Sequence, residues 1–326
     1  MFSGISLSQG GGGREMQALI ENIKKNFPKQ TTWNHTDEDS AVYPLGDGKY
    51  IVFTTDSFTV TPLFFPGGNI GDISFCGTCN DLLMMGAKPL GLSYSLILEE
   101  GFPVTELEKI NKCIGTLSEK TGIPIVTGDT KVLEKGKIDR LVINTSGVGI
   151  ADKDSLLTKP INEDDKIIIS GGIGEHAVAL LSKRFEYETD IITDSKPLVD
   201  EINEISSLIK AAKDPTRGGI AAALNEFSSK EGLGMIIDEE NIPVKNQVST
   251  VCEMLGLDAY ELACEGRLIC ISSAQNSEEV LKRLKKFNSE ASIIGQITKE
   301  KNVILKTSLG ERVLRQPSGR LVPRIC

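Results

Sequence analysis

The feature that most constrains this chain is a strand-and-helix pattern that occurs as two series, separated by a polar, proline-containing segment at residues 151–165. In the first series, residues 50–55 form a β-branched and aromatic run, and residues 103–117 place apolar side chains at helical spacing. In the second, a strand pattern at 166–170 leads through glycines into a helix from Glu175. Strands that alternate with helices are typical of α/β domains. At roughly 150 residues per domain, the 326 residues predict two of them, of α/β or α+β class.

The overall charge is acidic, because 45 aspartates and glutamates outnumber 36 lysines and arginines and leave a formal net charge of −9. Such a chain lacks the electrostatic attraction that holds proteins to nucleic acids or anionic membranes. No apolar run reaches the ~18 residues of a membrane span, and residues 1–13 lack the pattern of a signal peptide. The seven cysteines show no disulfide-framework spacing. We therefore expect a cytoplasmic protein that binds neither nucleic acid nor membrane.

Four consecutive glycines, Gly10, Gly11, Gly12 and Gly13, precede a helical pattern near the start of the chain. Glycines in such a run do not form a stable helix or strand interior. Before a helix, their backbone N–H groups can face an anion such as phosphate. A flexible arm is an equally good interpretation of this segment taken alone.

Aspartates recur at predicted strand ends and glycine turns. Taken singly, each is better explained as a helix cap or a turn residue. Taken together, oxygen ligands in loops are what Mg²⁺ needs when it bridges nucleotide phosphates. No P-loop and no dinucleotide-binding glycine motif is present, and the two histidines are too few for a histidine-rich metal site. The aspartates concerned are Asp39, Asp56, Asp81, Asp129 and Asp214.

The order of several motifs carries a family resemblance. Six of them are Gly-Gly-Gly-Gly-Arg (10–14), Glu-Asp-Ser-Ala-Val (38–42), Thr-Thr-Asp-Ser (54–57), Asn-Asp-Leu-Leu-Met-Met-Gly-Ala (80–87), Thr-Gly-Asp-Thr-Lys (127–131) and Asp-Pro-Thr-Arg-Gly-Gly (214–219). In this order they resemble the PurM-like ATP-binding superfamily. Three more are Phe-Phe-Pro-Gly-Gly (64–68), Leu-Glu-Glu-Gly-Phe-Pro (98–103) and the terminal Pro-Arg-Ile-Cys (323–326). These resemble the HypE family, the carbamoyl dehydratases of NiFe-hydrogenase maturation.

The resemblance implies a domain organisation and a reaction. An N-terminal α/β domain with the glycine-rich arm (1–153) would dimerise through its sheet, and an α+β domain (154–309) and a mobile tail (310–326) would follow. The carbamoyltransferase HypF would carbamoylate the terminal Cys326. ATP and Mg²⁺ would then drive dehydration of this thiocarboxamide to a thiocyanate. The cyano group would pass to iron in the HypC–HypD complex.

The same motifs imply the site residues. Asp39, Asp56, Asp81 and Asp214 would hold the metal, while Lys131 and Glu265 would transfer protons. ATP and phosphate contacts would come from Gly10, Gly11, Gly12, Gly13, Asn80, Thr130, Thr216 and Arg217. Thr216 and Arg217 also precede a predicted helix, whose N-terminus favours phosphate. A simple phosphate contact is the alternative role for Lys131.

Two positions depart from the family pattern. Gln9 stands where HypE proteins usually carry histidine, and Cys264 precedes Glu265 where they usually carry asparagine. Cys76 and Cys79 form a single Cys-x-x-Cys pair inside a predicted helix, so packing is a better interpretation than zinc binding.

Two other functions are open. One is another enzyme of the superfamily, such as a selenophosphate synthetase, which should carry a reactive cysteine beside the glycine run. No cysteine precedes Cys76. The other is a non-catalytic scaffold that binds ATP, against which Lys131, Glu265 and Cys326 together argue.

Overall fold

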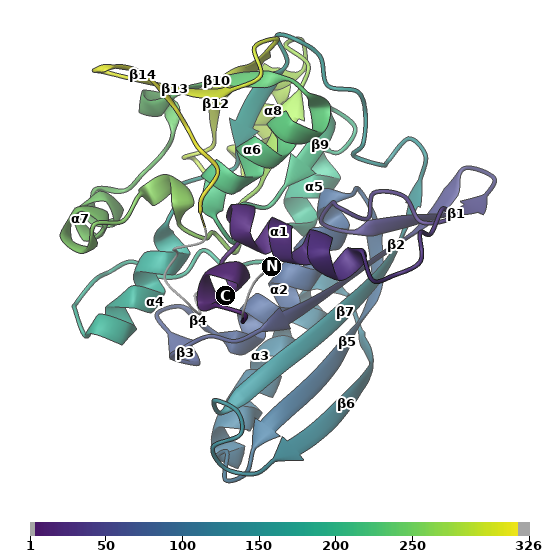
Figure 1. Cartoon of the computed structure of the whole chain (residues 1–326), viewed down its shortest axis with the longest axis vertical. Helices are drawn as coiled ribbons and strands as arrows, with labels where there is room; N and C mark the ends of the chain where they lie inside the picture. Colours follow the sequence, from purple (N-terminus) through teal and green to yellow (C-terminus); the bar gives the residue numbers. More distant parts are fainter. Residues whose placement is uncertain (1–3, 319–326) are drawn as a thin grey trace.

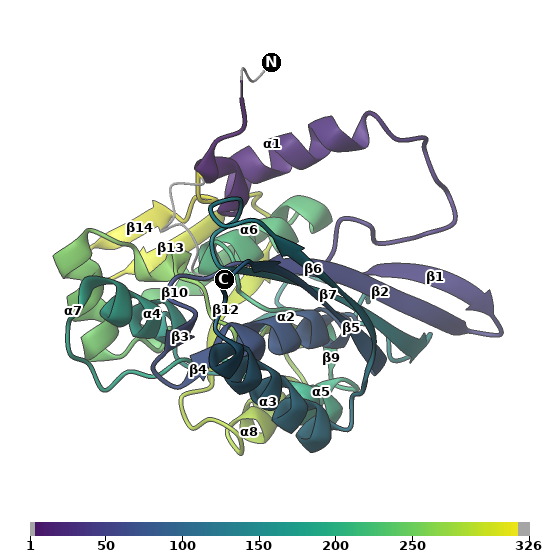
Figure 2. The same ribbon diagram turned by 90° about the horizontal axis from the view of Figure 1, so that it is seen from below.

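The computed structural model describes residues 4–318, which fold into two large sheets, a short hairpin and their covering helices (Figure 1). The first sheet comprises β1 (Ala41–Gly46), β2 (Lys49–Phe58), β5 (Lys88–Glu99), β6 (Ile125–Leu133) and β7 (Leu141–Asp152). Its order is β1-β2-β7-β5-β6, in which only β5 and β6 run parallel. The helices α2 (Ile70–Met84) and α3 (Val104–Thr121) lie on one side of this curved sheet (Figure 2).

Helix α2 is the central packing element of the first half. Asn69 caps it, since its side chain accepts a hydrogen bond from the Gly71 N–H at 2.7 Å, while the Asp72 carboxylate accepts one from the Asn69 N–H. Thirteen of its fifteen residues are buried, so the helix is enclosed on nearly all sides. Small residues permit this close packing: a Cβ on Gly77 would lie 2.9 Å from the Phe58 ring. The hairpin of β3 (Phe64–Phe65) and β4 (Gly68–Asn69) leads into the helix.

The second sheet has seven strands in the order β14-β13-β10-β12-β8-β11-β9, of which only β10 and β13 pair in parallel. Both of its faces are covered. Ile168 belongs to a core shared with the first half, and Ile167 and Ile169 belong to a second core that also takes in helix α6 (Gly219–Glu231). The strands are β8 (Lys166–Ile169), β9 (Ile209–Lys213), β10 (Gly234–Asp238), β11 (Ile269–Ser272), β12 (Ser292–Thr298), β13 (Val303–Thr307) and β14 (Gly310–Val313). The remaining helices of this half are α4 (Glu175–Phe185), α5 (Val199–Ile205), α7 (Asn246–Leu255) and α8 (Ser277–Leu284).

The N-terminal arm crosses between the two halves. A short 3₁₀ turn at Leu7–Gly10 is followed by α1 (Gly13–Lys24), which lies outside both sheets (Figures 1 and 2). The glycine run is therefore partly ordered: it ends one helix turn and begins the next helix.

The predicted α/β or α+β class is confirmed, but several details were wrong. Strand β6 includes the Thr-Gly-Asp-Thr-Lys motif and ends at Leu133. Asp56 lies inside β2 and Asp129 inside β6, so neither is at a strand end. In the segment expected to be a mobile tail, Gly310–Val313 pairs with β13, because it continues the sheet edge that β13 offers.

Among the described residues, no helix is both long enough and apolar enough to cross a membrane.

Candidate active site

A cleft of about 690 Å³ opens between the two halves of the molecule. Its walls come from α1 and the end of the glycine run, from the turn at residues 36–39 with β2 and α2, and from residues 213–226 of the second half. Small-molecule sites commonly enclose ~300–1,000 Å³, so a nucleotide fits this size. Eight carboxylate side chains line the cleft against three cationic ones. An anionic ligand therefore needs a cation or backbone N–H groups to bind here.

The four aspartates predicted as metal ligands all face this cleft. The Thr54 hydroxyl donates to Asp81 Oδ2 at 2.8 Å and lies 3.0 Å from the carbonyl oxygen of Asp39, which links α2 to the acidic turn. Asp214 directly follows β9. Buried oxygens of Asp39 (Oδ2) and Asp214 (Oδ2) have no hydrogen-bond partner. Such orphaned acceptors fit a cation.

The carboxylates of this cluster lie close enough to raise one another's pKa. Burial raises the pKa of Asp81 well above its usual value, and the negative charge of Asp214 adds to the increase. The pKa of Asp214 is raised in the same way by burial and by Asp39. Asp56 differs, because the Arg217 guanidinium 3.4 Å from its Oδ1 offsets part of the effect of burial on its pKa. Among residues 4–318, however, no three acidic, histidine or cysteine side chains converge closely enough to hold a metal by themselves.

A narrow recess extends the cleft toward Glu265. Asp56, Asp81, Thr216 and Arg217 line both spaces, and Glu265 lines the recess alone. Glu265 is only 2% exposed, and its Oε1 is buried without a partner. Burial raises its pKa well above the usual value, with further increases from Asp214 and Asp194. A buried carboxyl group with a raised pKa at the end of a cleft is suited to proton transfer.

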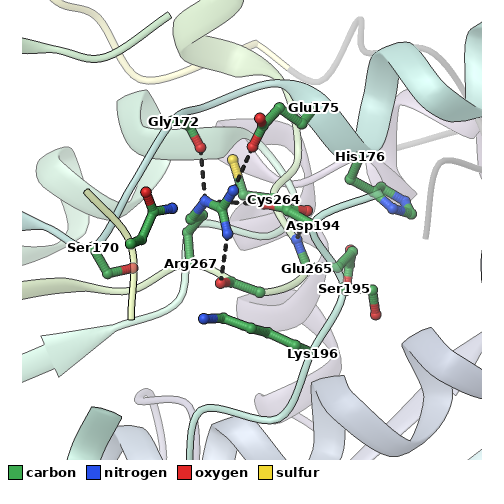
Figure 3. A network of polar contacts seen from close by, with 12 residues as sticks. Ser170, Gly172, Glu175, His176, Asp194, Ser195, Lys196, Cys264, Glu265 and Arg267 are labelled. Atoms are coloured by element: carbon green, nitrogen blue, oxygen red, sulfur yellow. Dashed lines mark hydrogen bonds and ion pairs between the residues drawn. The ribbon is translucent and has the colours of Figure 1, made fainter. Parts of the chain in front are cut away.

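Glu265 is held by a buried network around Arg267 (Figure 3). The Arg267 guanidinium donates to the Gly172 carbonyl at 2.9 Å and pairs with Glu175, while its Nε lies 3.7 Å from Asp194 Oδ2. The other oxygen of Asp194 accepts the backbone N–H of Glu265 at 3.1 Å. Arg267 thus fixes Asp194, and Asp194 fixes the backbone of Glu265.

Close backbone packing completes this support. A Cβ on Gly266 would lie 1.9 Å from the Asp194 carbonyl oxygen, so only glycine fits between the two segments. The same segment is held from α2, because Asn80 accepts from the Leu198 N–H at 2.9 Å and donates to the Lys196 carbonyl at 3.2 Å. Asn80 therefore uses its amide to join the two halves. The phosphate contact predicted for it stays a prediction.

The predicted site residues fall into two groups in this chain. Gly12, Gly13, Thr216 and Arg217 line the cleft with the four aspartates, and Glu265 lines the recess, whereas Gly10 and Gly11 line neither. Thr130 and Lys131 are exposed on β6 at the edge of the first sheet and line neither space. Three strand spacings of ~4.8 Å separate β6 from β2, which carries Asp56. Cys326 lies outside the described residues.

Sequence reasoning missed the cationic and supporting residues of the site: Glu175, Asp194, Lys213 and Arg267. Lys213 directly precedes Asp214, and that adjacency was an available signal. Asp194 and Arg267 lie in loops without periodicity, and only the fold brings them together.

The two departures from the family pattern are both buried. Cys264 Sγ accepts the Gly174 N–H at 3.5 Å, just before α4, so the thiol occupies a hydrogen-bonding position beside Glu265. Gln9 is 3% exposed, and its Oε1 accepts the Ser6 N–H at 2.8 Å. The Cys264 thiol thus holds the backbone just before α4, and the Gln9 side chain holds the turn that precedes the glycine run.

The chain beyond β14 returns to the glycine run. Leu314 is buried in the second core, and the Pro317 carbonyl accepts the Arg14 N–H at 3.2 Å. Gly13 has a φ of +74°, and a Cβ there would lie 2.2 Å from this carbonyl oxygen. The last described residues are thus attached beside the cleft.

Comparison with known proteins agrees with this geometry. The family of AIR synthase related proteins matches in two parts, the N-terminal domain at residues 37–151 and the C-terminal domain at 162–308. The carbamoyl dehydratase HypE of Rhizobium leguminosarum bv. viciae is 44% identical, over 99% of this chain and 95% of its own length. The carbamoyl dehydratase HypE of Escherichia coli K12 is 37% identical over 100% of both chains.

Solved structures give the same result. A chain of a HypE–HypF complex has a TM-score of 0.85 and 41% identity, covering 92% of this chain and 100% of its own. A hydrogenase maturation protein HypE in complex with ATP has a TM-score of 0.82 and 35% identity, covering 99% and 100%. With relatives of this identity along the whole chain, this chain belongs to the HypE family of carbamoyl dehydratases.

Proposed function

We propose that this chain is an ATP-dependent carbamoyl dehydratase that converts a carboxamide on Cys326 to a thiocyanate. The observation that carries the proposal is the nucleotide-sized acidic cleft whose recess ends at the buried, unpartnered Glu265. In this reaction the carboxamide oxygen attacks the γ-phosphorus of ATP, and ADP leaves. The C–O bond to the phosphorylated oxygen then breaks and releases phosphate, while the nitrogen gives up its two protons, which leaves a nitrile on sulfur. The nitrogen needs a base next to the phosphate site, and Glu265 is the candidate.

Magnesium fits the residues of the cleft. The free oxygens of Asp39 and Asp214, together with Asp56 and Asp81, are hard donors in an acidic cleft that must accept a polyphosphate. Since no three described side chains form a closed metal site, one or two carboxylates with phosphate oxygens are the expected ligands. When bound, the metal supplies charge neutralisation at the phosphates. The Arg217 side chain and the backbone N–H groups of Gly12 and Gly13 would position the phosphates.

Lys131 is proposed to act across a homodimer. It is exposed on the edge strand β6, and no described hydrogen bond or ion pair joins it to Glu265. A second copy that pairs with the first sheet would carry its own Lys131 toward the neighbouring cleft. The proton-transfer pair would then consist of Glu265 from one protomer and Lys131 from the other. A phosphate contact remains the alternative role of this lysine.

Cys326 is the proposed carrier. The chain is attached at Pro317, and the nine residues from Ser318 to Cys326 can span at most about 30 Å at ~3.3–3.6 Å each. The proposal requires that this length let the thiol meet a donor outside the cleft and then the recess. Carbamoyl transfer from HypF and cyanide transfer to HypC–HypD are the proposed steps before and after dehydration. A solved structure of a relative is a HypE–HypF complex, which supports the first of these steps. We place these reactions in the cytoplasm.

Mass spectrometry of the C-terminal peptide tests the proposal. Incubation with HypF, carbamoyl phosphate and Mg-ATP should first add a carbamoyl group to Cys326 and then remove one water from it. Glu265→Gln should stop at the carbamoylated form, because a general base contributes ~10²–10⁴-fold. A Cys326→Ala chain gives the control without a carrier. A parent protein that binds ATP but never loses water from the carbamoyl group would instead be a scaffold.

A further inference from the structure

A buried lysine ammonium lies among the carboxylates of the cleft. Lys213, the last residue of β9, has a side chain only 5% exposed. Its Nζ lies 3.0 Å from Asp39 Oδ1, 3.4 Å from Glu38 Oε2 and 3.4 Å from Glu226 Oε2. Glu38 and Asp39 belong to the acidic turn of the first half, and Glu226 belongs to α6 of the second. Lys213 therefore joins the two walls of the cleft.

The charge of this group is matched by its surroundings. Three carboxylates, those of Asp39, Glu38 and Glu226, lie within 3.4 Å of the ammonium and stabilise its positive charge. The Phe227 ring, 5.9 Å from the ammonium, adds a further favourable contact. A full positive charge thus sits directly against one of the proposed metal ligands.

The two oxygens of Asp39 are used differently. Oδ1 is taken by Lys213, while Oδ2 is buried without a partner, as is Oδ2 of the adjacent Asp214. A divalent cation at these free oxygens would lie close to the ammonium, and the two positive charges would repel each other. Phosphate oxygens could relieve this repulsion, because Lys213 lines the same cleft and can turn from a carboxylate to a phosphate.

We propose that Lys213 is an internal counter-cation that holds Asp39 until nucleotide arrives, so that the metal binds tightly only together with ATP. The proposal rests on the magnesium site of the proposed function. It makes metal and nucleotide binding strongly synergistic. It also assigns Lys213 a phosphate contact once metal and nucleotide are bound. The same side chain thus pairs with Asp39 in the nucleotide-free protein and with phosphate in the nucleotide-bound one.

Binding of Mn²⁺, followed by electron paramagnetic resonance, tests this with and without a non-hydrolysable ATP analogue. Without nucleotide, Lys213→Met should bind Mn²⁺ about tenfold or more tightly than the parent, because the competing charge is gone. With the analogue its advantage should disappear, because the phosphate contact is also lost. Lys213→Arg should behave like the parent. Lys230→Met is the matched control, since Lys230 pairs with Glu38 at 2.7 Å and does not line the cleft; its affinities should match the parent's.

Thermal unfolding gives a second readout and a check on folding. Nucleotide-free Lys213→Met should unfold at a lower temperature than the parent, and Mn²⁺ alone should restore it, while the parent barely responds. Lys213→Gln, which keeps a hydrogen-bonding group, replaces Lys213→Met should the latter not fold. Equal nucleotide-free Mn²⁺ affinity in parent and variant, with normal binding in the presence of the analogue, would refute the counter-cation and leave the metal site standing. A parent that takes up no Mn²⁺ even with the analogue would refute both.

Discussion

The two sheets of this molecule bury their strands in different ways. In the second sheet, Ile167, Ile168 and Ile169 of β8 are all fully buried, and so is the whole of β11, because both faces are covered. In the first sheet, buried and half-buried residues alternate along β7, and nearly all of β6 is exposed. The second sheet is complete within one chain. The first has one covered face and one that is open.

The open sheet carries apolar surface that a lone chain leaves in water. Phe53 is 41% exposed beside Trp33 and Tyr43, with ring centroids of Trp33 5.3 Å from Tyr43 and 6.3 Å from Phe53. Val126, on the edge strand β6, is 60% exposed. Unpaired edges and apolar faces of this kind are commonly covered by another chain. The second sheet therefore stabilises the fold, whereas the first sheet leaves one face and one edge available to a partner.

The largest expected effect comes from substituting aspartate for one apolar residue of either sheet, in two separate variants. Ile169→Asp should prevent folding, because an unpaired carboxylate would enter a core with no exposure. Val126→Asp should leave the folded protomer intact and dissociate the proposed dimer. Circular dichroism and analytical ultracentrifugation measure the two outcomes. Two outcomes would contradict the interpretation that the first sheet offers a dimer surface while the second only stabilises the fold. One is a Val126→Asp protein that unfolds, and the other is a parent that is monomeric at micromolar concentration.

Mixed dimers test the open sheet as a source of catalytic groups. Lys131→Ala and Glu265→Gln should each lower dehydration by ~10²–10⁴-fold. After subunit exchange, half of the dimers are mixed, and each has one intact site if the pair forms between protomers. Activity should then return to about a quarter of the parent's. Mixing two preparations of the same variant is the control, and the absence of any recovery would place both residues in one protomer's site.

Sequence patterns predicted the alternation of strands and helices and eight of the residues that line the cleft, among them its four aspartates. They succeeded because apolar periodicity is local, and because the motifs 38–42, 54–57 and 214–219 keep their order in the chain. They failed where the end of an element depends on how its residues are buried in the fold. Asp56 was expected to follow its strand, yet it lies within β2, since a strand can continue past a polar residue that faces a cleft.

The supporting network could not be predicted for a related reason. Asp194 and Glu265 are 71 residues apart and meet only through the fold of the second half. Nothing in either local pattern marks that contact. Lys131 shows the reverse: its motif is specific, but its distance from the cleft is a property of the strand order.

A smaller effect is expected where the Glu265 segment packs against the 193–196 segment within the second half. Gly266→Ala should destabilise the protein by about 1–3 kcal/mol, because the added Cβ meets the Asp194 carbonyl oxygen at 1.9 Å. Gly115→Ala is the matched control, since nothing lies within 4 Å of a Cβ at that position in α3. It should stabilise by about 0.5–1 kcal/mol. Urea unfolding measures both, and equal free energies of unfolding for the two variants would mean that the 193–196 segment yields without cost.

The smallest effect compares two aspartates that look alike in sequence but lie in different parts of the first half. Asp81, on α2, has a pKa raised by burial and by Asp214, whereas Asp129 is exposed on β6. In the protein free of metal and nucleotide at neutral pH, Asp81→Asn should raise the free energy of unfolding by about 1 kcal/mol, because it removes a repelled charge. Asp129→Asn should change it by less than about 0.5 kcal/mol. A raised pKa in the folded state means that Asp81 lowers stability as the pH rises, so the advantage of asparagine should shrink as the pH is lowered toward 5. The same Asp81→Asn protein should lose Mg-dependent ATP turnover, and a variant that gained stability while keeping turnover would show that the repulsion has no part in metal binding.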